Sequence, residues 1–125
     1  MATVQYIFIR VAAKMIRKLF LGIAMLSVTA SGMAGSQTGT VENLYVRASD
    51  GLVYFALKGT AKTGSPACAL IGYWMIKDEN SNAGKRQYAL LLAAQLAGKT
   101  VVVSGMNTCT RWADGEDVDV ATIVP

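Results

Sequence analysis

The chain has 125 residues, a formal net charge of +4 and no histidine. The absence of histidine excludes Ser-His and Cys-His catalytic dyads and removes the commonest general base and metal ligand. Four of the 12 basic residues precede Leu19 and no acidic residue precedes Glu42, so the part from Gly35 onward carries eight charges of each sign. The basic character belongs to the N-terminal segment, which argues against a nucleic-acid-binding surface.

The first third of the sequence, residues 1–34, has the layout of a secretory signal peptide. Basic residues are followed by an uncharged apolar run of 11 residues, Leu19–Thr29, and then by small residues up to Gly35. A membrane-spanning helix needs roughly 20 apolar residues, so this run is too short to span a bilayer. We expect cleavage after Ala34. Cleavage after Ala30 is the second choice, and an uncleaved membrane anchor is the remaining alternative.

A second methionine, Met15, begins a compact signal of ordinary length that needs nothing from the residues before it. We therefore expect Met15 to be the true initiator. The remainder of the chain, residues 35–125, has the length of one small domain. We expect this domain to be periplasmic or secreted.

Both cysteines, Cys68 and Cys109, lie in the segment after the signal. Two cysteines in a small exported domain indicate one disulfide, with a pair of buried free thiols as the alternative. The bond would close a loop of about 40 residues and contribute on the order of 4 kcal/mol to stability.

The domain is expected to begin with a flexible leader and a β-hairpin. Residues 35–40 are small and polar, which predicts the leader. Val41–Arg47 and Leu52–Lys58 are rich in branched and aromatic residues and predict two strands. The intervening Ala48–Gly51 ends in Asp-Gly, which predicts a hairpin turn, and Gly59–Pro66 has the composition of a loop.

A third strand and a polar turn are expected next. Ala67–Lys77 predicts a long strand that carries Cys68. Gly72 in its middle indicates a bulge or a bend. Asp78–Gly84 is a polar turn that leads into a helix.

Lys85–Ala97 is the predicted helix, because strong helix formers dominate it. Ser81 or Asn82 can cap its start, and Gly98 can end it as the residue after the C-cap. The apolar residues at helical spacing, which predict the buried face, are Tyr88, Leu91, Leu92 and Leu96.

Two further strands complete the domain. Thr100–Ser104 is short and apolar, which predicts a buried strand, and Val118–Val124 alternates in polarity as a strand does. The order strand, strand, strand, helix, strand, strand predicts a mainly β, five-stranded OB-fold-like barrel whose bottom is closed by the helix. An open α+β sheet with one packed helix is the alternative.

Four segments carry a likeness to a known family: Pro66–Ala69, Tyr88–Ala97, Gly98–Val103 and Thr108–Thr110. In these features the chain resembles the B subunits of ring-forming bacterial toxins, especially that of subtilase cytotoxin. The resemblance implies an OB-fold, a pentameric ring, recognition of cell-surface glycans and a toxin A subunit as partner. It assigns no sugar-contacting residue.

A cluster of carboxylates near the C-terminus is the one candidate metal site. It consists of Asp114, Glu116, Asp117 and Asp119. Its spacing does not follow the EF-hand loop, and alternate residues of a strand face opposite ways, so a solvated acidic turn is favoured over a calcium site. The sequence has no glycine-rich phosphate loop and no metal-spaced cysteine set. We predict neither a metal nor a cofactor.

Aromatic residues are the candidate ligand-binding groups. A sugar site combines a flat aromatic face with polar hydrogen-bonding partners, and Trp112 beside Arg111 and Asp114 fits this chemistry. Tyr73 and Trp74 are adjacent on a predicted strand, so one of them faces outward as a ligand platform or a subunit contact. The alternative for Trp112 is that it packs over the disulfide.

Together these features predict a non-enzymatic, exported and oligomeric binding domain whose leading ligand is a glycan. The alternative is a periplasmic accessory or structural protein that binds another exported protein. We expect no nucleic-acid partner and no membrane span after cleavage.

Overall fold

The computed structural model describes residues 32–125. Most of the predicted signal peptide, including the Met15 start, lies outside the described residues. Within residues 32–125, no helix is both long enough and apolar enough to cross a membrane.

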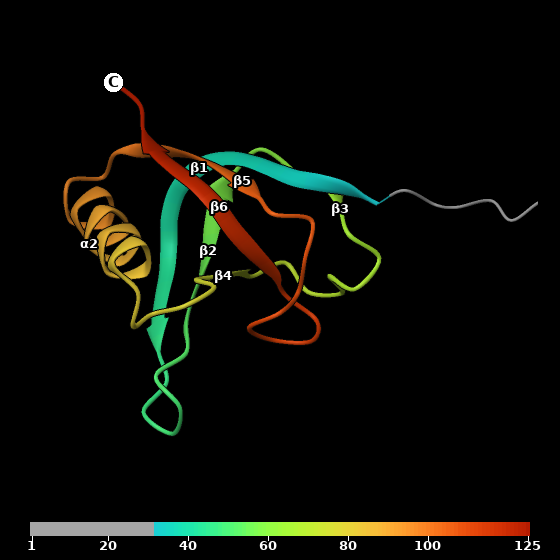
Figure 1. The fold of residues 1–125 in the computed structure, drawn as a ribbon. Helices are drawn as coiled ribbons and strands as arrows, with labels where there is room; N and C mark the ends of the chain where they lie inside the picture. The colour runs from blue at the N-terminus through green and yellow to red at the C-terminus, as the bar shows by residue number, and fades with distance from the viewer. Residues whose placement is uncertain (1–31) are drawn as a thin grey trace, which may run out of the picture. The chain divides into compact units, whose positions relative to one another are not determined.

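The described chain is mainly β with one helix (Figure 1), as the sequence predicts. Its elements are β1 Met33–Val46, β2 Val53–Gly59, β3 Thr63–Ser65, β4 Trp74–Met75, α2 Asn82–Leu96, β5 Thr100–Gly105 and β6 Glu116–Ile123. β1 pairs antiparallel with β2 and β5, β5 pairs antiparallel with β6, β6 runs parallel to β4, and β4 returns to β2. These five strands form a closed ring of pairings, and β3 pairs with the start of β1.

The first strand is longer than predicted, because residues 35–40 belong to β1 and are not a flexible leader. The start of β1 pairs with β5 and its end pairs with β2, so this one strand closes the ring. Gly39 belongs to both pairings, and a side chain there would collide with the carbonyl group of Lys58. The small residues of this segment therefore allow the close approach of neighbouring strands.

The position of β1 bears on the predicted cleavage of the signal peptide. Cleavage after Ala34 would fall inside β1, whereas cleavage after Ala30 would precede it.

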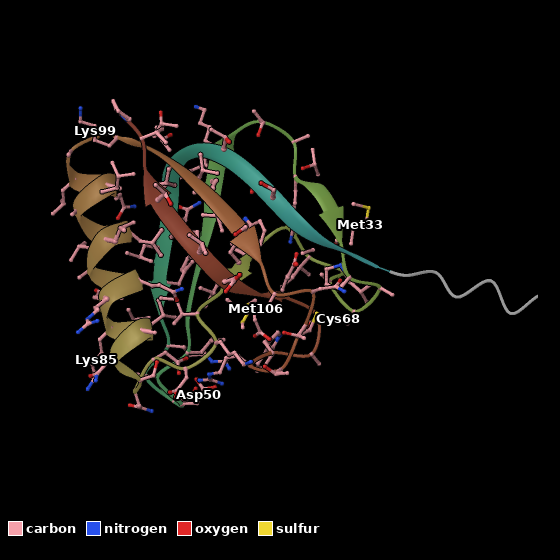
Figure 2. All side chains as sticks on the ribbon, turned by 45° about the horizontal axis from the view of Figure 1, so that its top comes forward. Met33, Asp50, Cys68, Lys85, Lys99 and Met106 are labelled. Atoms are coloured by element: carbon pink, nitrogen blue, oxygen red, sulfur yellow. A yellow bond between two sulfur atoms is a disulfide. The ribbon has the colours of Figure 1, made fainter. Side chains whose placement is uncertain are left out.

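The predicted hairpin is confirmed. β1 and β2 pair antiparallel from Gly39↔Gly59 to Val46↔Val53. Gly51 closes the connecting turn with a φ of 75°, a left-handed conformation that glycine adopts without strain. Figure 2 shows Asp50 of this turn at the tip of the hairpin.

The predicted third strand is wrong for most of its length, since only Trp74 and Met75 of residues 67–77 form β4. The backbone N–H groups of Leu70 and Ile71 donate to the carbonyl oxygen of Asp114, at 2.9 and 3.1 Å, and not to a neighbouring strand. The predicted bend at Gly72 is confirmed. The segment between β3 and β4 is thus a loop fastened to the β5–β6 loop.

The predicted disulfide is confirmed and fastens the same two loops. Cys68 and Cys109 are bonded, with their Cα atoms 6.2 Å apart and a sequence separation of 41. Cys68 therefore lies on the loop before β4 and not on a strand.

The helix is confirmed, with a correction to its buried face. Ser81 caps α2 by accepting a hydrogen bond from Gly84 N, at 3.0 Å, and Gly98 comes after the helix with a φ of 61°. Leu91 and Ala94 are fully buried, but the predicted Leu92 and Leu96 are exposed, Leu96 to 81%. The buried face is narrow, since its buried residues are Gly84, Leu91 and Ala94, and a side chain at Gly84 would collide with the backbone of Asp78.

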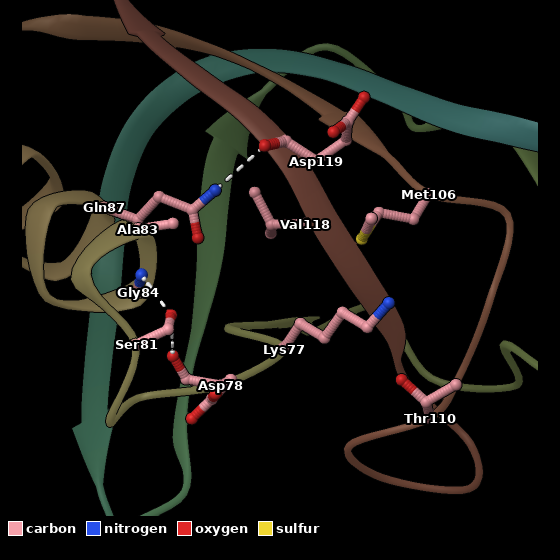
Figure 3. A pocket seen from close by; sticks show the side chains of 10 residues that line it. All are labelled: Lys77, Asp78, Ser81, Ala83, Gly84, Gln87, Met106, Thr110, Val118 and Asp119. Atoms are coloured by element: carbon pink, nitrogen blue, oxygen red, sulfur yellow. Dashed lines mark hydrogen bonds between the residues drawn. The ribbon is translucent and has the colours of Figure 1, made fainter.

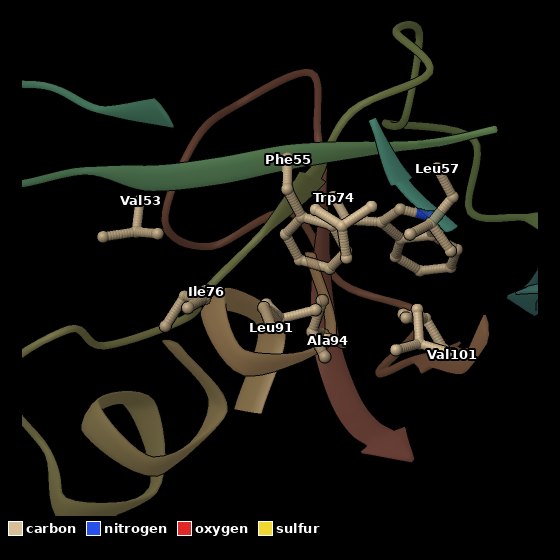
Figure 4. Close-up of a cluster of buried hydrophobic side chains, with 11 residues drawn as sticks. Val53, Phe55, Leu57, Trp74, Ile76, Leu91, Ala94 and Val101 are labelled. Carbon is tan, nitrogen blue, oxygen red and sulfur yellow. The ribbon is translucent and has the colours of Figure 1, made fainter. Parts of the chain in front are cut away.

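The core lies inside the ring, between the strands and α2 (Figure 4). Phe55, Trp74, Ile76, Leu91 and Val101 are completely buried. The indole N–H of Trp74 donates to Gln37 Oε1 at 2.8 Å, so its polar atom is satisfied inside the protein. Trp74 is therefore a core residue, which corrects its prediction as a ligand platform.

Candidate ligand-binding site

Three aromatic residues from separate parts of the chain surround one hollow of about 190 Å³. Tyr54 comes from β2, Tyr73 directly precedes β4, and Trp112 lies in the β5–β6 loop. We call this feature the aromatic hollow. Its other lining residues are Arg47, Leu52, Ile71 and Met75.

Three tyrosines pack together at one side of the aromatic hollow, and two of them, Tyr54 and Tyr73, line it. The rings of Tyr45 and Tyr54 stack with their centroids 4.6 Å apart, and Tyr73 meets them edge-on at 5.8 and 5.5 Å. The Tyr73 hydroxyl, as a hydrogen-bonding partner, raises the pKa of Tyr45 above its ordinary value. Mutual packing of this kind holds aromatic faces in place before a ligand arrives.

Arg47 fixes Trp112 on the opposite side. Its guanidinium carbon lies 4.2 Å from the centroid of the Trp112 ring, which is the geometry of a cation–π contact. The same guanidinium donates to both carboxylate oxygens of Asp50, at 2.8 and 2.6 Å. These hydrogen bonds lower the pKa of Asp50, and a further one comes from Leu52 N. The hairpin turn therefore holds the indole ring in position.

Arg111 directly precedes Trp112 in the β5–β6 loop and joins two other segments. Its Nε donates to Glu79 Oε1 at 2.7 Å, and its Nη2 donates to the carbonyl oxygen of Asp50 at 3.1 Å. Glu79 Oε1 also accepts from Val53 N at 3.1 Å. The guanidinium groups of Arg47 and Arg111 are thus matched by two carboxylates. These two arginines therefore leave no excess positive charge that would attract the phosphate backbone of a nucleic acid.

Asp117 shapes the loop that carries Trp112. Its carboxylate accepts four hydrogen bonds, from Thr108 Oγ1, Thr110 N and Thr110 Oγ1 at 2.7 Å each and from Arg111 N at 3.1 Å. Burial raises the pKa of Asp117, but the hydrogen bonds from Thr110, Thr108 and Arg111 outweigh this effect and lower it. The carboxylate is ionised and acts as a template for the loop.

The burial of Asp117 and Glu116 corrects the prediction of a solvated acidic turn, since both side chains are 0% exposed. In the part of the chain that the structure describes, no three His, Cys, Asp or Glu residues are grouped so that they could hold a metal ion. Glu116 forms an ion pair with Lys62, and Asp117 accepts hydrogen bonds from the β5–β6 loop.

The template role of Asp117 predicts a pH-dependent stability. The pKa of Asp117 in the folded protein is below the unfolded value of about 3.9. The ionised carboxylate therefore contributes fully to the free energy of unfolding above that pH, and this contribution is lost as the pH falls through the folded pKa. We expect Asp117→Asn to lower the free energy of unfolding at pH 7 by about 1–3 kcal/mol. Urea denaturation at pH 7 and pH 3 tests this. An equal loss at both pH values, or none at pH 7, would contradict the role.

The predicted site residues are only partly brought together. Tyr73 and Trp112 line the aromatic hollow, whereas Arg111 is not one of its lining residues and pairs with Asp50. Asp114 acts through its backbone carbonyl, which holds the loop of Ile71. Sequence reasoning missed the other five lining residues, which are Arg47, Leu52, Tyr54, Ile71 and Met75. Tyr54 alone had a signal, because it alternates with the buried Val53 and Phe55 and so faces outward on β2.

A second and larger hollow of about 440 Å³ lies between the start of α2, β6 and the β5–β6 loop (Figure 3). We call it the polar groove. Across it, Gln87 Nε2 donates to the carbonyl oxygen of Asp119 at 2.9 Å. Its lining residues are Lys77, Asp78, Ser81, Ala83, Gly84, Gln87, Met106, Thr110, Val118 and Asp119.

Comparison with known proteins assigns no relative: no protein-family model matches the chain, and neither the curated proteins nor the solved structures give a significant match. The function is therefore argued from the two hollows themselves.

Proposed function

We propose that this protein is a non-enzymatic binding domain that recognises carbohydrate through the aromatic hollow. The observation that carries the proposal is the convergence of Tyr54, Tyr73 and Trp112 on one hollow. Flat aromatic faces offer a sugar ring an apolar surface, while tyrosine hydroxyls and arginine N–H groups supply polar partners at the rim.

The position of the hollow supports this proposal. The pairing order β1-β2-β4-β6-β5, with α2 between β4 and β5, is the order expected for an OB-fold, and we assign the ring to that fold. OB-folds bind oligonucleotides or oligosaccharides on the face of their second and third strands, between the loops that flank that face. In this chain those elements are β2, β4, the β1–β2 loop and the β5–β6 loop, and they supply Tyr54, Met75, Arg47 and Trp112 to the hollow.

Charge favours carbohydrate over nucleic acid on this face. Arg47 and Arg111 are paired with Asp50 and Glu79, so no unpaired basic stripe runs beside the aromatic side chains. The predicted export and the balanced charge from Gly35 onward point the same way. We propose that the domain works in the periplasm or outside the cell, as a homo-oligomer. The toxin resemblance makes a pentamer and a toxin A subunit the specific form of this proposal.

Replacing Trp112 tests the proposed function. We expect oxidised wild-type protein to bind glycans on an array, and Trp112→Ala to weaken that binding about tenfold or more, because about 1.4 kcal/mol of stacking is lost. Leu96→Ala is the matched control, since Leu96 is an 81% exposed side chain on α2 that does not line the hollow. A folded, oxidised wild type without any glycan hit, or a Trp112→Ala variant that binds normally, would refute the proposal.

Recognition of another exported protein is the second candidate, and the base of the aromatic hollow favours it. Leu52, Ile71 and Met75 line the hollow with aliphatic surface, which suits an apolar side chain of a protein partner. A pull-down from periplasmic extract with wild type and Trp112→Ala separates the two candidates. A partner captured only by wild type, together with an empty glycan array, would favour the accessory protein.

A further inference from the structure

The aromatic hollow and the polar groove share two segments of the chain. After β4 begins, Met75 lines the aromatic hollow and Lys77 lines the polar groove. In the β5–β6 loop, Trp112 lines the first hollow and Thr110 lines the second. Residues two apart in a chain have Cα atoms at most roughly 7 Å apart. The two hollows therefore lie close together along these two segments.

Arg111 follows Thr110 and precedes Trp112 in the loop, so it connects a residue of the polar groove to a residue of the aromatic hollow. A guanidinium has five N–H donors, and three of those of Arg111 are directed to Glu79 and Asp50. Its side chain is 20% exposed and lines neither hollow, so its remaining donors are available only to a ligand that extends beyond the lining residues. Because its partners hold it in place, Arg111 offers these donors without a further ordering cost.

The polar groove has the chemistry of a site for a neutral, hydroxyl-rich group. Within residues 32–125, Lys77, Asp78 and Asp119 form no ion pair, so they can offer both donors and acceptors to hydroxyl groups. Met106 and Val118 add an apolar patch beside them (Figure 3). Two carboxylates would repel an acidic ligand. A sugar ring without charge fits this lining.

Size points to the combined use of the two hollows. Small-molecule sites have volumes of roughly 300–1,000 Å³, and the aromatic hollow alone, at about 190 Å³, is smaller than that range. The adjoining polar groove of about 440 Å³ brings the pair within it. We infer that one ligand occupies both hollows: a neutral oligosaccharide of at least two rings, with one ring on Trp112 and the next in the polar groove. This inference rests on the proposed carbohydrate function.

Titration with neutral sugars of increasing length tests the inference. The ligands are glucose, galactose and N-acetylglucosamine, then cellobiose, lactose and N-acetyllactosamine, then cellotriose, with binding measured by calorimetry. We expect a disaccharide or trisaccharide to bind at least tenfold more tightly than its component monosaccharide. Lys77→Ala and Asp119→Asn should remove this gain, so that the longer sugar binds no more tightly than its component monosaccharide. Lys99→Ala and Glu42→Gln, at exposed positions outside both hollows, are the matched controls.

The outcomes separate this inference from the proposed function. If the protein bound a monosaccharide and an oligosaccharide with equal affinity, the inference would be overturned. The same would follow if the Lys77→Ala and Asp119→Asn variants still bound the longer sugar more tightly. Weaker sugar binding by Trp112→Ala would in either case uphold the aromatic hollow as a binding site. If wild-type protein bound none of these sugars and no array glycan, the proposed function and the inference would both be overturned.

Discussion

Glu116→Gln is expected to lower the free energy of unfolding by about 3–5 kcal/mol, the range for breaking a buried ion pair by removing one partner. Glu116 is completely buried, and its Oε2 lies 2.8 Å from Lys62 Nζ. Its Oε1 accepts from Gly35 N at 2.8 Å and from Asn107 N at 3.2 Å. A glutamine would place an N–H group toward the ammonium and leave that charge without a counter-ion.

The cost is large because the cation cannot escape to water without disrupting the core. Lys62 is only 15% exposed, and its Nζ lies 3.8 Å from the centroid of the Trp74 ring, which is itself fully buried. The glycines around the carboxylate show how closely the chain packs there. A side chain at Gly35 or Gly105 would collide with Glu116. Glu116 therefore joins the start of β1, the β2–β3 connection and the β5–β6 loop at one point.

Urea denaturation monitored by tryptophan fluorescence measures the effect, with the exposed Glu42→Gln as control. The double variant Lys62→Met/Glu116→Gln should be more stable than Glu116→Gln alone, because it removes the buried cation as well. A single variant that loses less than about 1 kcal/mol would show that the pair is dispensable. A double variant no better than the single one would mean that the lost backbone contacts, and not the uncompensated charge, set the cost.

The sequence predicted those elements that depend on local signals. Asp-Gly at residues 50–51 marks the hairpin turn, Ser81 caps the helix, and Gly98 ends it in a left-handed conformation, all as the structure has them. Each of these features is decided by a few neighbouring residues whose backbone preferences are strong.

The sequence-based predictions were wrong where a backbone group or a charged side chain binds a partner far away in the sequence. Residues 67–73 have a strand-like composition, but Leu70 and Ile71 give their N–H groups to Asp114, more than forty positions away. Glu116 resembles a solvated charge until Lys62 is placed beside it. Local patterns carry no information about such partners, because only the closed ring brings them together.

The candidate site shows the same division. Trp112 and Tyr73 were found because aromatic residues in loops and at strand ends are unusual enough to single out. Arg47 and Met75 were missed, since nothing in their local sequence says that the β1–β2 turn and β4 meet at one surface. A ligand site assembled from four segments becomes visible only once the strand order of the ring is known.

Removing the disulfide is the second large expected effect. Cys68→Ser/Cys109→Ser should lower the free energy of unfolding by about 2–5 kcal/mol, and a domain of this size should lose roughly 10–30 °C of melting temperature. The bond joins two loops that together supply Ile71 and Trp112 to the aromatic hollow. Its loss frees both walls at once, so we expect binding on the hollow to weaken even at temperatures where the variant remains folded.

Thermal unfolding of the double serine variant, and of wild type with and without dithiothreitol, measures the stability change. Native-state hydrogen exchange at Leu70 and Ile71 separates the two roles of the bond. The backbone N–H groups of Leu70 and Ile71 donate to the carbonyl oxygen of Asp114. If the disulfide holds the two loops together, these N–H groups will exchange faster in the variant than in wild type under folding conditions. Unchanged exchange with a lower melting temperature would mean that the disulfide acts only on the unfolded chain. The backbone carbonyl group of Asp114 and the carboxylate of Asp117 would then suffice to hold the site.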